Sequence, residues 1–132
     1  MKFQALVLVS LMLLAGGSLF AADTGFFSGY LADQACGVAG KSPMDGSDMV
    51  NAPWDHTKGC AVACATVTGE KGLGLMVPNG ATFKFVPFDA AGNKIAAKAL
   101  AASKKKAGLT FVVEGTLKGD TIVVSSVKET NL

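Results

Sequence analysis

The stretch WDHTKGCAVAC, residues 54–64, places a histidine and two cysteines at intervals of four residues. His56, Cys60 and Cys64 are the only histidine and two of the three cysteines in the 132-residue chain, and Cys36 is the third. Thiolates and imidazoles bind zinc and copper, oxidised thiols form disulfides, and a thiol beside an imidazole can react as a nucleophile. The spacing therefore raises three chemistries: a metal centre, a disulfide and a reactive thiol.

Residues four apart lie on one face of a helix, so a helix over Thr57–Ala65 would direct Cys60 and Cys64 toward the same neighbour. His56 would lie just ahead of the first turn. The Cβ vectors of two such helical residues do not converge well for a disulfide bridge. If a disulfide forms, we therefore expect Cys36 to pair with one of the two.

The metal interpretation uses all four groups, because three thiolates and an imidazole suit a closed tetrahedral zinc site. The predicted metal ligands are Cys36, His56, Cys60 and Cys64. Met44 and Met49 lie in the same segment, so copper(I), a softer ion, is a second possibility. We prefer the metal because it employs the histidine and leaves no thiol over, and the disulfide stays open as the alternative.

The first 21 residues have the pattern of a secretory signal peptide: a charged start at Lys2, an apolar run over residues 3–14, and small residues before cleavage after Ala21. The apolar run is short for a membrane span, so we expect no stable membrane anchor after cleavage. The predicted location is periplasmic or secreted. In an oxidising compartment thiols tend to pair, and three cysteines leave one over.

Composition argues against nucleic acid as a partner. Without Lys2 the chain carries eleven lysines against ten acidic residues, and it contains no arginine. Strong nucleic-acid binding normally needs a dense basic field, in which arginine is the preferred reader. The expected partner is a metal ion or a small ligand, and residues 22–132 are expected to form a single domain.

Apolar patterning predicts five strands. GFFSGYLAD, residues 25–33, is the first, and LGLMVPNGATFKFVPF, residues 73–88, is a hairpin around Asn79-Gly80. The last two strands, within residues 109–129, turn at Gly119-Asp120, and they place Leu109, Phe111, Val113 and Leu117 on one face.

Between these strands we expect one helix, capped by Asn93 and ended by Gly108, and an irregular insertion over residues 34–67 after strand one. The predicted fold is all-β with one or two short helices: a small five-stranded OB-like barrel, closed or partly open. A flatter α+β sheet is the alternative. Within the insertion, the run Asp45–Asp48 is expected to be a solvated turn.

GYLADQACG, HTKGCAVAC and GTLKGDTIVVSSVK together resemble a group of small exported bacterial proteins of unassigned function. Their pattern is D-x2-C, then H-x3-C-x3-C, then a C-terminal strand pair like that of an OB barrel. The matching positions are Asp33, Cys36, His56, Cys60 and Cys64. The resemblance implies the fold and the cysteine framework, and it implies no activity.

These patterns favour an exported, non-catalytic module that binds zinc, copper or another ligand at a Cys and His centre. One alternative is a thiol-disulfide or redox protein with one structural disulfide and a reactive cysteine beside His56. The other is a purely structural secreted domain held by a disulfide.

Overall fold

A computed structural model describes residues 24–66 and 71–131 of the chain. The predicted signal peptide, residues 1–21, lies outside this range. In the described part, no helix has the length and apolar character needed to cross a membrane.

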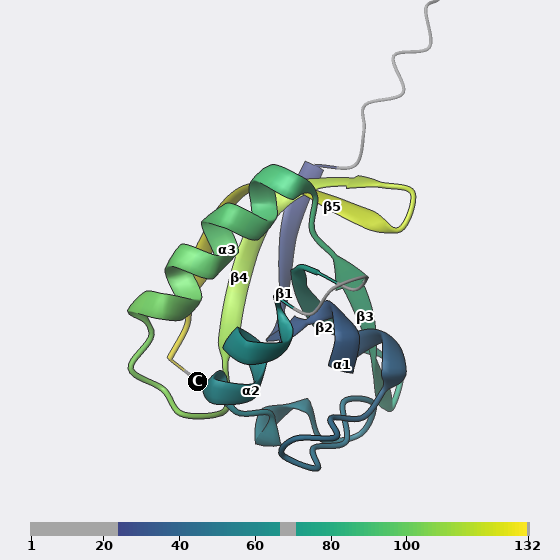
Figure 1. The fold of residues 1–132 in the computed structure, drawn as a ribbon. Helices are drawn as coiled ribbons and strands as arrows, with labels where there is room; N and C mark the ends of the chain where they lie inside the picture. The colour runs from purple at the N-terminus through teal and green to yellow at the C-terminus, as the bar shows by residue number, and fades with distance from the viewer. Residues whose placement is uncertain (1–23, 67–70, 132) are drawn as a thin grey trace, which may run out of the picture.

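The described residues form one five-stranded antiparallel sheet with the strand order β3-β2-β1-β4-β5 (Figure 1). Its strands are β1 (Thr24–Asp33), β2 (Leu73–Asn79), β3 (Thr82–Pro87), β4 (Thr110–Lys118) and β5 (Thr121–Glu129). The sheet is not closed into a barrel. Its two edge strands are linked by a single parallel bridge, between Phe88, directly after β3, and Ile122 in β5. The prediction of a five-stranded OB-like barrel, closed or partly open, is therefore confirmed in its open form.

Local sequence explains the two hairpins. Gly80 and Gly119 have φ angles of 63° and 59°, in the left-handed region that a tight turn requires. In β4 the alternating residues Phe111 and Val113 are fully buried, as predicted. Leu117 lies beyond a register shift at Glu114/Gly115 and is 37% exposed, so the predicted inward row ends before it.

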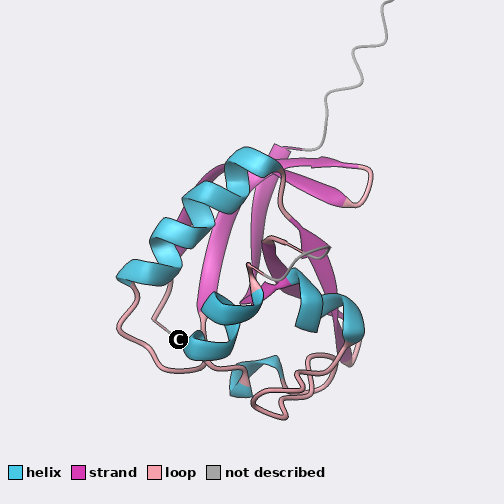
Figure 2. Cartoon of the chain, in the orientation of Figure 1, coloured by secondary structure: helices cyan, strands magenta, loops and turns pink. Residues whose placement is uncertain are grey.

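The described residues contain three α-helices, one more than the largest number predicted: α1 (Gln34–Ala39), α2 (Lys58–Cys64) and α3 (Ala90–Ala102). A short 3-10 helix, η1, covers Pro53–Asp55. Figure 2 shows α3 lying along the sheet, while α1, α2 and the long loop gather at one end of it. The predicted insertion thus folds over the end of β1.

The bounds of α3 differ from the prediction. Its N-cap is Asp89, whose side chain accepts a hydrogen bond from the Gly92 amide, so the helix begins ahead of Asn93. Asn93 instead accepts a hydrogen bond from the Leu73 amide and ties the helix to β2. The helix ends at Ala102, well before Gly108.

Buried side chains form two groups. The main core is aliphatic and aromatic, and it consists of Leu31, Ala61, Leu73, Leu75, Phe88, Ala96, Leu100, Leu109, Phe111, Val113, Ile122 and Val124. The second group, here called the sulfur cluster, consists of Ala32, Cys36, Met49, Cys60, Cys64 and Met76. Successive side chains of a strand point to opposite faces, so β1 supplies Leu31 to one group and Ala32 to the other.

Candidate metal centre

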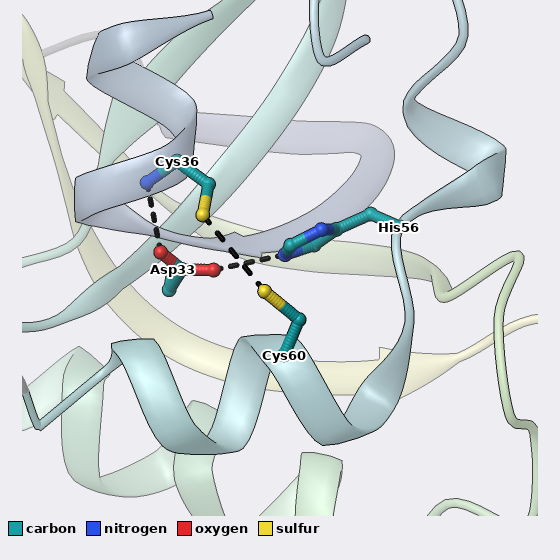
Figure 3. A group of neighbouring side chains, drawn as sticks. All are labelled: Asp33, Cys36, His56 and Cys60. Atoms are coloured by element: carbon teal, nitrogen blue, oxygen red, sulfur yellow. Dashed lines mark hydrogen bonds and ion pairs between the residues drawn. The ribbon is translucent and has the colours of Figure 1, made fainter. Parts of the chain in front are cut away.

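Four potential metal ligands meet beside the sulfur cluster: Asp33, Cys36, His56 and Cys60. One ligand atom from each lies within 4.8 Å of the other three, and all four residues are buried. Figure 3 shows the side chains converging from β1 and α1 on one side, from α2 on the other, and from the segment ahead of α2. Residues far apart in the sequence therefore form one compact donor set.

Asp33 is the last residue of β1 and the N-cap of α1. Its Oδ2 accepts a hydrogen bond from the Cys36 backbone amide at 2.8 Å, which fixes the first turn of the helix. Its Oδ1 lies 2.8 Å from Nε2 of His56. One carboxylate thus orients both the helix that carries Cys36 and the imidazole.

Close packing positions Cys36. At Gly37 a Cβ atom would overlap the ring of Phe85, so the absence of a side chain lets α1 lie against β3. Gly40, with a φ of 75°, ends the helix in the left-handed conformation, and its amide bonds back to the Cys36 carbonyl. The Cys36 side chain is 1% exposed as a result.

Helix α2 repeats the same local design. Thr57 is its N-cap, and its hydroxyl accepts a hydrogen bond from the Cys60 amide at 3.2 Å. A capping residue thus stands three positions before Cys60, as Asp33 stands three positions before Cys36. Cys64 follows one turn later, and its Sγ lies 3.6 Å from Sγ of Cys60.

His56 lies between carboxylates on both sides of its ring. Beyond the Asp33 contact, Nδ1 lies 3.0 Å from Oγ of Ser47 and 3.1 Å from Oδ2 of Asp45. Each ring nitrogen therefore faces an oxygen atom of a neighbouring side chain. The histidine is 1% exposed, and its orientation is fixed from both ends.

The turn at Asp45 is exposed, as predicted, but its side chain also takes part in the site. Although the turn is exposed, the Asp45 side chain is only 14% exposed and contacts His56. It also accepts hydrogen bonds from the Thr57 amide at 2.8 Å and from the Ser47 hydroxyl at 2.6 Å. The long loop is thereby fastened to the start of α2.

Burial and hydrogen bonding act in opposite directions on these groups. Burial favours the neutral acids, but hydrogen bonds from His56 and the Cys36 amide outweigh it and lower the pKa of Asp33. For Asp45, hydrogen bonds from Ser47 and Thr57 likewise outweigh burial and hold the pKa well below its usual range. Burial raises the pKa of Cys36, and it raises that of Cys64 to about 11. The two carboxyl groups are therefore ionised, and the thiols of Cys36 and Cys64 stay protonated in the absence of a cation.

All three cysteines are free, so the disulfide alternative is not realised in this structure. The Sγ atoms of Cys36 and Cys60 are 4.0 Å apart, about twice the length of a disulfide bond, which is about 2.05 Å. In a tetrahedral site with metal–sulfur bonds of about 2.3 Å, two sulfur ligands lie about 3.8 Å apart. The observed distance between the two sulfur atoms is close to that of two sulfurs bound to one metal ion.

The sequence prediction named Cys36, His56 and Cys60, which the structure brings together. Cys64 lies beside this group through Cys60, and its role as a ligand stays a prediction. Asp33 entered the sequence analysis only through the resemblance, although an aspartate three residues before a cysteine could have been read as an N-cap that faces the site. No sequence signal distinguished Asp45 from other acidic residues of a polar loop.

Comparison with protein-family models, with curated proteins and with solved structures gives no match to this chain. The function is therefore argued from the chemistry of the site.

Proposed function

We propose that this chain is a non-catalytic metal-binding module that holds zinc at Asp33, Cys36, His56 and Cys60. The observation that carries the proposal is the meeting of these four buried donors within 4.8 Å. Zinc binds thiolates, imidazole and carboxylate in tetrahedral sites, and a mixed set of two sulfurs, one nitrogen and one oxygen suits it.

The hydrogen bond between Nε2 of His56 and Oδ1 of Asp33 supports this assignment. These two potential ligand atoms are 2.8 Å apart and share one proton, so both face the same position. A metal cation can replace that proton. On the other side of the ring, Asp45 and Ser47 hold Nδ1. Carboxylates in that position orient metal-binding histidines and raise their basicity.

The test is a zinc titration of the mature chain, purified reduced and without oxygen, against a competing chromophoric chelator. We expect a single tight equivalent that is lost in His56→Ala and in Cys60→Ser. Asp48→Asn is the matched control, because Asp48 is an exposed acid of the same loop. A wild-type chain that fails to compete with the chelator would overturn the proposal.

Cys64 is the fourth ligand expected from the sequence, and we propose Asp33 in its place. Cys64→Ser should then keep the zinc equivalent, whereas Asp33→Ala should lose it. The opposite result would return Cys64 to the ligand set.

A second candidate function is thiol-disulfide exchange, favoured by the position of Cys60 between two other thiols at 4.0 and 3.6 Å. An external oxidant would remove two electrons and two protons from a pair that includes Cys60. Thiol counting on freshly exported protein separates the two functions: three free thiols after metal removal support the metal site, and one free thiol supports the redox function.

We also propose that the chain acts outside the cytoplasm, in the periplasm or as a secreted protein. The proposal rests on the signal-like pattern of residues 1–21. N-terminal sequencing of exported material should begin within a residue or two of Ala22. A membrane-bound chain that still begins at Met1 would contradict it.

A further inference from the structure

All sulfur-bearing side chains in the described part of the chain lie in one region. Five of them belong to the sulfur cluster, and the sixth, Met44, contacts it through Cys64. They are Cys36, Met44, Met49, Cys60, Cys64 and Met76. The main core, which is larger, contains no methionine and no cysteine. This segregation is more than the proposed zinc centre requires, because that centre uses only two of the six sulfurs.

Four of these sulfurs form a continuous line from the centre to the surface. Cys36 Sγ lies 4.0 Å from Cys60 Sγ, which lies 3.6 Å from Cys64 Sγ. The Cys64 thiol in turn donates to Sδ of Met44 at 3.4 Å. The line therefore runs from buried thiols to a thioether at the surface.

Exposure rises steeply at the outer end of this line. Cys60 and Cys64 are 3% and 6% exposed, whereas Met44 is 64% exposed. Met44 lies on the turn at residues 43–45, and Asp45 of the same turn is bonded to Thr57 at the start of α2. The turn is thus held against the helix that carries both cysteines.

We propose a second metal site, formed by Met44, Cys60 and Cys64, that takes a soft monovalent cation, copper(I). The proposal rests on the proposed function in one respect, since Cys60 would serve both sites. Thioether sulfur is a poor ligand for zinc, whereas copper(I) binds thiolates and thioethers alike. Met44 therefore makes the outer site selective for copper(I).

Binding at this site is an exchange of protons for the ion. In the zinc-free chain, Cys60 and Cys64 each lose a thiol proton to solvent, and two metal–thiolate bonds form. The neutral thioether of Met44 donates a lone pair, so copper stays in the +1 state and no electron is transferred. Metal–sulfur bonds of about 2.3 Å place three sulfur ligands about 3.8 to 4.0 Å apart. The two contacts made by Cys64, at 3.6 Å to Cys60 and 3.4 Å to Met44, are each within about 0.6 Å of this range, and the exposed Met44 side chain closes the third side of the site by swinging toward Cys60.

The first test measures copper(I) affinity of the reduced mature chain without oxygen, by competition with a colorimetric copper(I) chelator. Met44→Leu removes the sulfur and conserves volume, on an exposed turn where folding is little affected. We expect a loss of at least about tenfold, the scale on which even outer-shell partners of metal sites act. Met49→Leu is the matched control, since the Met49 sulfur accepts a hydrogen bond from the Ser47 hydroxyl and is not a proposed copper ligand. Its affinity should match wild type.

The second test observes the bond directly. Protein grown with selenomethionine and loaded with copper(I) should show copper–selenium scattering in its X-ray absorption spectrum. The signal should persist in Met49→Leu and vanish in Met44→Leu. A copper-loaded wild type without copper–selenium scattering would overturn the site.

Zinc titrations of the same variants separate this inference from the proposed function. Met44→Leu should bind zinc as wild type does, because Met44 is not a zinc ligand. Unchanged copper(I) affinity in Met44→Leu, with zinc bound normally, would overturn the copper(I) site alone. Absence of zinc binding, with the copper–selenium signal present, would overturn the zinc centre alone.

Discussion

The main core and the sulfur cluster share strands β1 and β2, yet they are held together by different forces. In β2, Leu75 belongs to the main core and its neighbour Met76 to the sulfur cluster. The main core is uniformly apolar, so its cohesion comes from burial and packing. Around the sulfur cluster lie the buried polar residues Asp33, Ser42, Ser47 and His56. One region is therefore uniformly apolar, and the other combines buried sulfur and polar groups at the proposed zinc centre.

Polar burial is costly unless every group has a partner. In the described residues, no buried side-chain nitrogen or oxygen lacks a hydrogen-bond partner. Near the sulfur cluster several of these partners are side chains, such as Ser47 and Asp33 for His56. The region should therefore respond to metal and to single polar substitutions, while the main core should respond only to loss of volume.

The largest expected effect is in the main core. Phe111 is fully buried, so Phe111→Ala should destabilise the fold by about 3 to 5 kcal/mol. The loss should be the same with and without zinc, because the side chain lies in the main core and not in the sulfur cluster. Reversible denaturant unfolding measures it. A loss under about 1 kcal/mol would mean that the packing of Phe111 contributes little to the free energy of unfolding.

Zinc should stabilise the folded chain through the proposed centre beside the sulfur cluster. At about a thousand times its dissociation constant, a ligand that binds only the folded chain adds about 4 kcal/mol. We expect that gain in wild type and in Phe111→Ala, and no gain in Cys60→Ser, with thermal melts as the measurement. Equal stabilisation of Cys60→Ser would show that zinc acts elsewhere on the chain.

Asp45 separates orientation of the imidazole from direct metal ligation, since it contacts His56 without being a proposed ligand. Asp45→Asn keeps the size of the side chain and removes its charge, and it should weaken zinc binding by about 10- to 100-fold. The metal-free fold should also melt lower than wild type, because the ionised Asp45 side chain fastens the loop to the start of α2. Asp48→Asn should leave zinc affinity unchanged, and an equal loss in both variants would point to general charge instead of orientation of the ring.

The smallest effects come from the two helix caps. Asp89→Ala and Thr57→Ala each remove an N-cap, which typically costs about 1 kcal/mol. Only Thr57→Ala should also weaken zinc binding, because Thr57 fixes the turn that carries Cys60. Equal zinc affinities in the two variants would show that the cap of α2 does not position the thiol.

Much of the fold could be predicted because its signals are local. Asn79-Gly80 predicts a hairpin, and the buried alternation through Phe111 and Val113 predicts a strand. Helix α1 was missed because Gln34–Ala39 has only six residues, one of which is Gly37. Its apolar pattern is too short to show a helical period. So short a helix is stable only through its cap and its packing. The start of α3 was misplaced because Asp89 and Asn93 are both good N-cap residues, and the contact of Asn93 with β2 is not local.

The sequence by itself determined the donor types, the spacing that puts Cys60 and Cys64 on one helix face, and the strand periods that build the sheet. These follow from backbone geometry over a few residues. Only the tertiary structure decided that Asp33 faces His56 across 23 residues, that the Asp45 carboxylate contacts the ring, and that Met44 contacts Cys64. Each of these contacts depends on how the long loop folds back over the end of β1. That path is set by packing and by hydrogen bonds between distant segments, for which a single sequence carries no periodic signal.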